Sequence, residues 1–115
     1  MLNLSIIIPT RNRSEFLNKT LESITNQTMN KSLFEVIIVD NGSTDNTKKI
    51  ISDYIDKLNI KYLYEPKLGL HEGRHTGLKN ASCEILVYID DDIEAFPEWL
   101  QTIQNVFEKD KEIVL

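Results

Sequence analysis

The fold class is decided by one stretch of the sequence, Phe34-Glu35-Val36-Ile37-Ile38-Val39-Asp40-Asn41-Gly42-Ser43. Residues 34–39 form a short run that is apolar on both faces, as a central strand of a parallel sheet must be. The turn-forming residues that follow, Asn41-Gly42-Ser43, lead the chain toward a helix. The stretch therefore predicts a buried β-strand that opens a β-α-β unit.

The same alternation of short strands and longer helices continues on both sides of this stretch. Strands are predicted at residues 4–8, 34–39, 60–64 and 85–89, and Pro9 is expected to end the first of them. Helices are predicted after Ser14, after Ser43, at residues 72–80 and from Pro97 onward. This order predicts an α/β domain with a mostly parallel, doubly wound, Rossmann-like sheet and helices on both of its faces.

Three of the predicted helices carry an apolar stripe with helical spacing. Ser14 is expected to cap the first helix, and Pro97 is expected to lie in the first turn of the last one. The three stripes are Phe16, Leu17, Thr20, Leu21 and Ile24; Ile50, Ile51, Tyr54, Ile55 and Leu58; and Trp99, Leu100, Ile103, Val106 and Phe107.

The composition restricts the class of protein. A chain of 115 residues that is 41% hydrophobic has the size of one domain with its own core. Eighteen acidic and 13 basic side chains give a net charge of -5, so no positive field gathers nucleic acid. Cys83 is the only cysteine, and neither a secretion signal nor an apolar run of about 20 residues occurs. We therefore expect a cytoplasmic protein.

Unusual polar residues follow each predicted strand. The first strand is followed by Pro9-Thr10-Arg11-Asn12-Arg13, the second by Asp40-Asn41-Gly42-Ser43, the third by Glu65 and the fourth by Asp90-Asp91-Asp92. Open parallel sheets bind ligands at the carboxyl ends of their strands. We therefore expect these four strand ends to form one binding rim.

The triplet Asp90-Asp91-Asp92 is the sharpest of these signals, because adjacent carboxylates repel one another unless a cation joins them. Hard oxygen ligands suit Mg²⁺ or Mn²⁺, which also bind the phosphate oxygens of a nucleotide. The alternative is a solvated acidic turn whose charge complements the dipole of the next helix. The position of the triplet directly after a buried strand favours the metal.

The other polar residues carry weaker signals when they are taken singly. Taken alone, Asp40 is better explained by an Asx-turn, and Arg11, Arg13 and Arg74 are better explained by solvated surface positions. His71 and His75 lack a third ligand at metal spacing. Neither a phosphate-binding loop of the G-x-x-x-x-G-K-[ST] type nor a G-x-G-x-x-G sequence occurs, which excludes the usual ATP and dinucleotide sites.

The order of these motifs resembles the family 2 glycosyltransferases, which have the GT-A fold. The resemblance covers nearly the whole chain. It rests on residues 5–13, residues 21–28, residues 34–45, the segment from Gly69 through Arg74 to Gly77, and Asp90-Asp91-Asp92. Two positions depart from the family pattern: Asn41 stands where a second aspartate is frequent, and His75 stands where asparagine is frequent.

The resemblance implies a nucleotide-sugar site. Pro9, Thr10 and Asp40 match residues that contact the base and ribose, and Asp90 and Asp92 match the D-x-D pair. The implied nucleotide-sugar-binding set is Pro9, Thr10, Arg11, Asp40, Arg74, Asp90 and Asp91. The implied ligands of Mn²⁺ or Mg²⁺ are Asp92 chiefly and Asp90 secondarily.

The implied reaction is inverting transfer of a sugar from a nucleotide-diphosphate sugar to an acceptor hydroxyl, commonly in polysaccharide or glycoconjugate assembly. Residues 1–115 are expected to be the nucleotide-sugar-binding part of a single GT-A domain. The general base and the acceptor-binding residues are expected beyond residue 115, so this chain alone should be inactive. An unfinished strand at residues 113–115 suggests an exposed sheet edge or face that allows homodimers, and missing regions or partners allow membrane association.

Two alternatives come from other functional classes. A receiver-like signalling module has the same kind of sheet, but its acidic pair follows the first strand, where this chain has Pro9-Thr10. A catalytically inactive relative that binds nucleotide as a scaffold agrees with all the residues of this chain.

Overall fold

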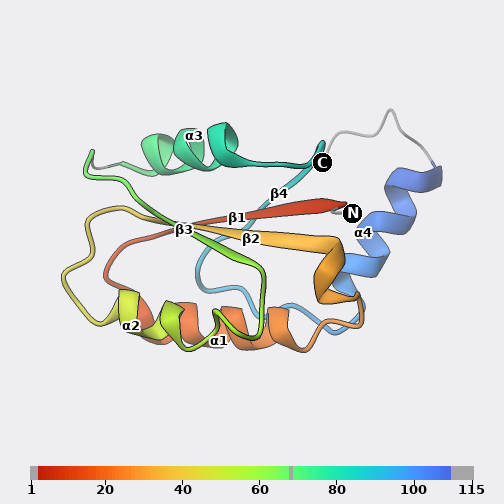
Figure 1. Ribbon diagram of the computed structural model, residues 1–115, viewed down its shortest axis with the longest axis horizontal. Helices are drawn as coiled ribbons and strands as arrows, with labels where there is room; N and C mark the ends of the chain where they lie inside the picture. Colours follow the sequence, from red (N-terminus) through yellow and green to blue (C-terminus); the bar gives the residue numbers. More distant parts are fainter. Residues whose placement is uncertain (1–2, 68, 110–115) are drawn as a thin grey trace.

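The computed structural model describes residues 3–67 and 69–109. Within them, parallel strands alternate with α-helices along the chain (Figure 1). The elements are β1 (Leu4–Thr10), α1 (Ser14–Thr25), the 3-10 helix η1 (Lys31–Leu33), β2 (Phe34–Asp40), α2 (Thr47–Ser52), β3 (Ile60–Tyr64), α3 (Leu70–Asn80), β4 (Ile85–Tyr88) and α4 (Trp99–Lys109). The predicted α/β class is confirmed.

The four strands of the described sheet lie in the order β3-β2-β1-β4, and every pair is parallel. Leu4 of β1 is in register with Phe34 of β2 and with Ile85 of β4. The two strands in the middle, β1 and β2, have the longest apolar runs and are buried almost throughout. This agrees with the rule that a central parallel strand is apolar on both faces.

Helices cover both faces of the sheet, as predicted. Figure 1 shows α3 on one face and α1 and α2 on the other. Alternate residues of β1 and β2 supply the two faces, so Ile6 and Ile8 pack in the large core while Ile7 packs beneath α3. The large core includes sheet residues, Leu17, Leu21 and Ile24 of α1, and Leu100 and Ile103 of α4. Burial of each such side chain stabilises the fold by about 1.5–3 kcal/mol.

The first strand does not end at Pro9, contrary to the prediction, but continues to Thr10. The carbonyl of Ile7 accepts a hydrogen bond from Ile89 at 3.1 Å, and the carbonyl of Thr10 accepts one from Asn41 at 2.9 Å. Because backbone groups alternate sides along a strand, the Pro9 nitrogen faces the β4 side, where it has no N–H to donate. Pro9 therefore ends the pairing of β1 with β4 but leaves its pairing with β2 intact.

The predicted cap of α1 is wrong. Ser14 is the first residue of α1, and its backbone N–H donates to the Asp45 carboxylate at 3.2 Å. The same carboxylate accepts the backbone N–H of Thr47 at 3.0 Å, at the start of α2. Ser43 does not cap α2 but accepts the backbone N–H of Asn12 at 3.0 Å. A single aspartate between β2 and α2 thus serves two helices, which local sequence patterns do not reveal.

Several predicted boundaries and stripe positions also differ. β2 and β4 end at Asp40 and Tyr88, and α3 begins at Leu70. The strand at residues 60–64 is confirmed. Phe16 and Ile55 are each 50% exposed, so they are not core residues, and Pro97 precedes α4 instead of lying in its first turn.

The predicted strand at residues 113–115 lies outside the described residues. β4 is an edge strand of the described sheet, while the exposed edge expected from residues 113–115 and the dimer stay predictions.

One charged side chain lies inside this sheet. Glu35 of β2 is 1% exposed and accepts hydrogen bonds from Ser5 at 2.6 Å and from the backbone of Ser82 at 2.7 Å. Lys61 of β3 forms an ion pair with it at 3.2 Å. Burial opposes ionisation of Glu35, but these hydrogen bonds and Lys61 outweigh it and lower the pKa of the carboxyl. The network fastens the turn after α3 to the sheet.

No helix in residues 3–67 and 69–109 combines the length and the apolar character that crossing a membrane requires.

Candidate functional site

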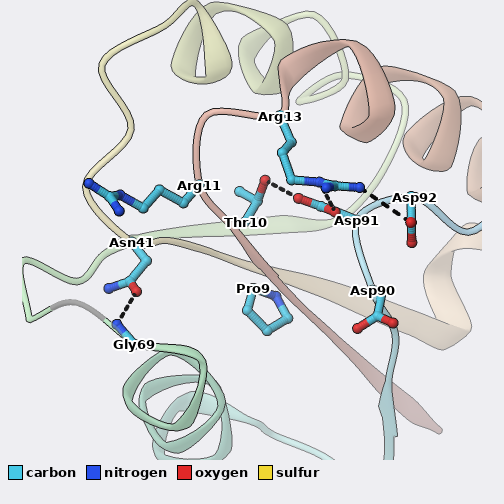
Figure 2. A pocket seen from close by; sticks show the side chains of 9 residues that line it. All are labelled: Pro9, Thr10, Arg11, Arg13, Asn41, Gly69, Asp90, Asp91 and Asp92. Carbon is cyan, nitrogen blue, oxygen red and sulfur yellow. Dashed lines mark hydrogen bonds and ion pairs between the residues drawn. The ribbon is translucent and has the colours of Figure 1, made fainter.

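A pocket of about 460 Å³ opens at the carboxyl ends of β1 and β4 (Figure 2). Its lining residues are Pro9, Thr10, Arg11, Arg13, Asn41, Gly69, Asp90, Asp91 and Asp92. The pocket lies just beyond the point where the pairing of β1 with β4 ends. The predicted rim is therefore a hollow built by the ends of β1, β2 and β4.

Asp91 is the buried member of the aspartate triplet and is 7% exposed. One of its carboxylate oxygens accepts the Thr10 hydroxyl at 2.8 Å, and the other accepts Nε of Arg13 at 2.8 Å. Its backbone carbonyl accepts the hydroxyl of Thr20, in α1, at 2.9 Å. Asp91 thus joins the end of β1, helix α1 and the loop after β4. Its predicted contact with the nucleotide sugar stays a prediction.

Arg13 bridges two members of the triplet. While its Nε contacts Asp91, its Nη2 lies 3.2 Å from a carboxylate oxygen of Asp92. The guanidinium carbon also lies 4.5 Å from the centre of the Phe16 ring. Figure 2 shows the guanidinium between the two carboxylates. This bridge supplies the cation that three adjacent carboxylates require, and it explains why Phe16 lies at the surface instead of in the core.

Asp90 and Asp92 are both exposed at the pocket, one on each side of the buried Asp91. Among the described residues, no group of three or more His, Cys, Asp or Glu side chains is placed to hold a metal ion. Mg²⁺ commonly takes only one or two carboxylates and completes its coordination with water and substrate phosphates, and Mn²⁺ prefers the same oxygen ligands. Two exposed carboxylates therefore fit such an ion together with a diphosphate, while the metal itself stays a prediction.

Asn41 fastens the loop after β3 to the pocket. Its amide nitrogen donates to the carbonyls of Glu65 at 2.9 Å and Lys67 at 2.6 Å. Its amide oxygen accepts the backbone N–H of Gly69 at 2.9 Å. The side chain thus needs a donor and an acceptor at once, which an asparagine has and an ionised aspartate lacks. This explains the departure from the family pattern at position 41.

Asp40 does not line this pocket. It faces a neighbouring pocket of about 350 Å³, whose other lining residues are Ser43, Asp45, Lys48, Tyr62 and Tyr64. Its carboxylate accepts the backbone N–H of Ser43 at 2.9 Å and the Tyr62 hydroxyl at 2.6 Å. Burial, and then the hydrogen bond to Asp40, raise the pKa of Tyr62, which keeps its hydroxyl a donor. The bond from Ser43 closes the turn after β2 over three residues, not the two of an Asx-turn, and a base contact by Asp40 stays a prediction.

Arg74 is also separate from Pro9, Thr10 and Arg11. It lies on α3 and lines a pocket of about 460 Å³ whose other lining residues are Tyr88, Ile89, Asp90, Ile93, Glu94, Ala95, Phe96 and Trp99. Asp90 lines both this pocket and the one that holds Asp92. Of the predicted set, the structure therefore gathers Pro9, Thr10, Arg11 and the three aspartates, and places Asp40 and Arg74 on either side of them.

The sequence placed Arg13 and Asn41 on the predicted rim, but the implied nucleotide-sugar-binding set leaves out Arg13, Asn41 and Gly69. The signal for Arg13 was its place three residues after Thr10, but an arginine in a loop is usually solvated. The partners of Asn41 are 24 and 26 residues away along the chain, at Glu65 and Lys67. Contacts over such separations leave no periodic pattern in one sequence.

Comparison with known proteins agrees with the resemblance. The sequence model of glycosyl transferase family 2 matches residues 5–115. Validoxylamine A glucosyltransferase from Streptomyces hygroscopicus subsp. jinggangensis is 37% identical over 102 residues, which cover 87% of this chain and 24% of that protein. The poly(ribitol-phosphate) beta-N-acetylglucosaminyltransferase TarS of Staphylococcus aureus is 36% identical over 94 residues, or 80% of this chain and 16% of TarS. The chain thus spans a quarter or less of the length of these two relatives.

Solved structures give the same result for the fold. A crystal structure of S. aureus TarS in complex with UDP matches with a TM-score of 0.90 and 31% identity, covering 94% of this chain and 32% of that one. The mannosyltransferase PcManGT from Pyrobaculum calidifontis, in complex with GDP-Man and Mn²⁺, matches with a TM-score of 0.73 and 28% identity, covering 78% of this chain and 27% of that one. The sheet and helices described above are therefore those of the GT-A fold. Since the family match extends from Ser5 to the last residue, we conclude that this chain belongs to glycosyl transferase family 2.

Proposed function

We propose that the protein of which this chain is part transfers a sugar from a nucleotide-diphosphate sugar to an acceptor hydroxyl with inversion, and that this chain binds the donor. The observation that carries the proposal is the pocket in which the Pro9-Thr10 end of β1 faces the exposed Asp90 and Asp92. Family membership supports it, as do the UDP and UDP-GlcNAc complexes of TarS. The receiver-like alternative receives no such support, because no acidic pair follows β1.

Five residues of the pocket have a proposed part in donor binding. Asp92 and Asp90 hold Mn²⁺ or Mg²⁺, which when bound neutralises the departing nucleoside diphosphate. Arg11 and Arg13 add positive charge beside that diphosphate, and Thr10 positions the ribose side of the pocket. Asp40 and Arg74 approach the nucleotide from the two neighbouring pockets. A complex of PcManGT with GDP-Man and Mn²⁺ supports the choice of metal.

The general base is proposed to lie beyond residue 115. Inverting transfer needs a carboxylate within hydrogen-bond reach of the acceptor hydroxyl. Glu65 is already engaged, because its carboxylate accepts the Thr76 hydroxyl at 2.6 Å and the backbone N–H of Lys67 at 2.9 Å. We therefore expect residues 1–115 to bind donor without acceptor-dependent turnover. Release of nucleoside diphosphate by this chain, at the rate of the longer protein, would place the base within these residues.

The single cysteine, Cys83, supports a cytoplasmic setting.

The proposal is tested by thermal denaturation with UDP, with and without Mn²⁺. A ligand present at about 100 times its Kd stabilises the folded state by about 2.7 kcal/mol, which raises the Tm by several degrees. We expect this shift only when UDP and Mn²⁺ are both present. Asp92→Asn should remove the shift, whereas Glu94→Gln, which removes the same charge two residues away, should keep it. A full shift in Asp92→Asn would show that the triplet is an ordinary acidic turn.

A further inference from the structure

We propose that Arg13 is a built-in counter-cation of the aspartate triplet, which competes with the divalent ion for Asp92 and passes to the diphosphate when that ion binds. This rests on the proposed donor and metal site. It goes beyond that site by giving Arg13 two opposite effects, one on the free metal ion and one on the nucleotide.

The two ends of the Arg13 guanidinium are held very differently. Its Nε contacts Asp91, whose side chain is 9% exposed and also accepts the Thr10 hydroxyl. Its Nη2 contacts Asp92, whose side chain is 47% exposed. An ion pair with an exposed carboxylate is weak, since water and salt screen it. The contact with Asp92 is therefore the one that a stronger cation replaces.

The guanidinium does not leave the pocket when that contact breaks. Its Nε remains on the buried Asp91, and its planar group remains stacked on Phe16 at 4.5 Å. Only Nη2 is released from Asp92. The two Nη groups of a guanidinium form a fork that matches phosphate oxygens. Arg13 is thus positioned to lose a carboxylate and gain a phosphate without a movement of the backbone.

The charges of the pocket favour the exchange of Asp92 for a phosphate group as the partner of Arg13. A divalent ion on Asp92 adds two positive charges beside a guanidinium that already lies 3.2 Å from that carboxylate. The guanidinium and the divalent ion would repel each other, and an anion that contacts both offsets this repulsion. The diphosphate of the donor is such an anion. Arg13 therefore weakens the binding of the metal alone and strengthens the binding of nucleoside diphosphate in the presence of the metal.

The test measures these two affinities separately. Mn²⁺ binding without nucleotide is measured by electron paramagnetic resonance of free Mn²⁺, and UDP binding at saturating Mn²⁺ by calorimetry. In Arg13→Gln we expect Mn²⁺ alone to bind roughly two- to fivefold more tightly, the range that loss of a competing exposed ion pair allows. UDP should bind more weakly to the same variant. Damage to the fold would weaken the binding of both Mn²⁺ and UDP. Tighter binding of Mn²⁺ together with weaker binding of UDP therefore identifies the proposed role.

Arg11→Gln is the matched control, because Arg11 lines the same pocket and loses the same charge, but its side chain lies apart from the triplet in Figure 2. It should change the affinity for free Mn²⁺ less than Arg13→Gln does. If Arg13→Gln does not fold, Arg13→Lys replaces it, because an ammonium keeps a charge for Asp91 but does not reach both carboxylates. Arg13→Lys should also bind free Mn²⁺ more tightly.

Two negative results have different meanings. An affinity for free Mn²⁺ that is equal in the wild type and both Arg13 variants, but falls in Asp92→Asn, overturns the competition while the proposed metal site stands. If neither the wild type nor any variant binds Mn²⁺, with or without UDP, the proposed metal site and this inference are both overturned.

Discussion

The Thr10 hydroxyl donates a hydrogen bond to the Asp91 carboxylate at 2.8 Å, between residues that lie 81 positions apart in the sequence. Both side chains are buried, at 4% and 7% exposure. The bond ties the end of β1 to the loop after β4 at the point where Pro9 has ended their backbone pairing. It therefore replaces the missing ladder bonds and fixes the width of the pocket.

Thr10→Val tests this bond. Valine has the shape of threonine but leaves a buried carboxylate oxygen without its donor, so we expect the free energy of unfolding to fall by about 1–3 kcal/mol. Urea denaturation measures the change. Thr44→Val is the control, because Thr44 is exposed, and it should change stability by less than about 0.5 kcal/mol. Equal losses in the two variants would show that the Thr10–Asp91 bond contributes nothing specific.

Asn41→Asp should destabilise the chain although the two side chains have the same shape. An ionised aspartate places an oxygen against the carbonyls of Glu65 and Lys67, to which the Asn41 amide now donates. We expect a loss of at least about 1–3 kcal/mol in urea denaturation at pH 7. Hydrogen exchange should show faster opening at the Gly69 amide.

Asn12→Asp is the control for that variant. The Asn12 side-chain oxygen only accepts, from the backbone N–H groups of Thr44 at 2.7 Å and Asp45 at 3.2 Å. An aspartate accepts the same bonds, so the stability should change little. Similar losses at positions 12 and 41 would attribute the effect to the added charge instead of the lost donor.

Glu35 gives the stability a dependence on acid pH. Its folded-state pKa lies below its ordinary value of 4.5, so the stability that it contributes is fully present above that value. This contribution is lost as the pH falls through the lowered pKa. Glu35→Gln should therefore be less stable than the wild type at pH 7, by about 1–3 kcal/mol, and the gap should narrow in acid. Exposed Glu84→Gln should show no such gap, and a constant gap for Glu35→Gln would contradict the ion pair.

Gly77→Ala should destabilise α3 on the sheet. Alanine is the better helix former by about 1 kcal/mol, but its Cβ would overlap the Cγ2 methyl of Ile7. Overpacking of this kind costs about 1–3 kcal/mol, so the net change should be a loss. Gly73→Ala, whose Cβ would lie 3.2 Å from that of Pro9, should lose less. Thermal denaturation compares the two, and a higher Tm for Gly77→Ala would mean that α3 moves away from β1 freely.

The sequence by itself determined the fold class, the order of the elements and the position of the pocket. These follow from local features: the apolar run at residues 34–39, the helical spacing of Leu17, Leu21 and Ile24, and the rule that ligands bind beyond the ends of parallel strands. Predictions from local patterns are wrong where a contact with another part of the structure takes precedence. Ser14 does not cap α1, and its N–H donates to Asp45. Phe16 is not a core residue, and its ring stacks on Arg13.

Only the tertiary structure decided which of the three adjacent aspartates is buried. Thr10, Thr20 and Arg13 hold Asp91 inside the protein by hydrogen bonds, and Asp90 and Asp92 lie at the surface. It also decided that Asp40 faces Tyr62 and that Arg74 lies over a separate pocket. The physical reason is that hydrogen bonds between residues 22 to 81 positions apart depend on how the sheet and helices pack, and packing leaves no periodic signal in a single chain.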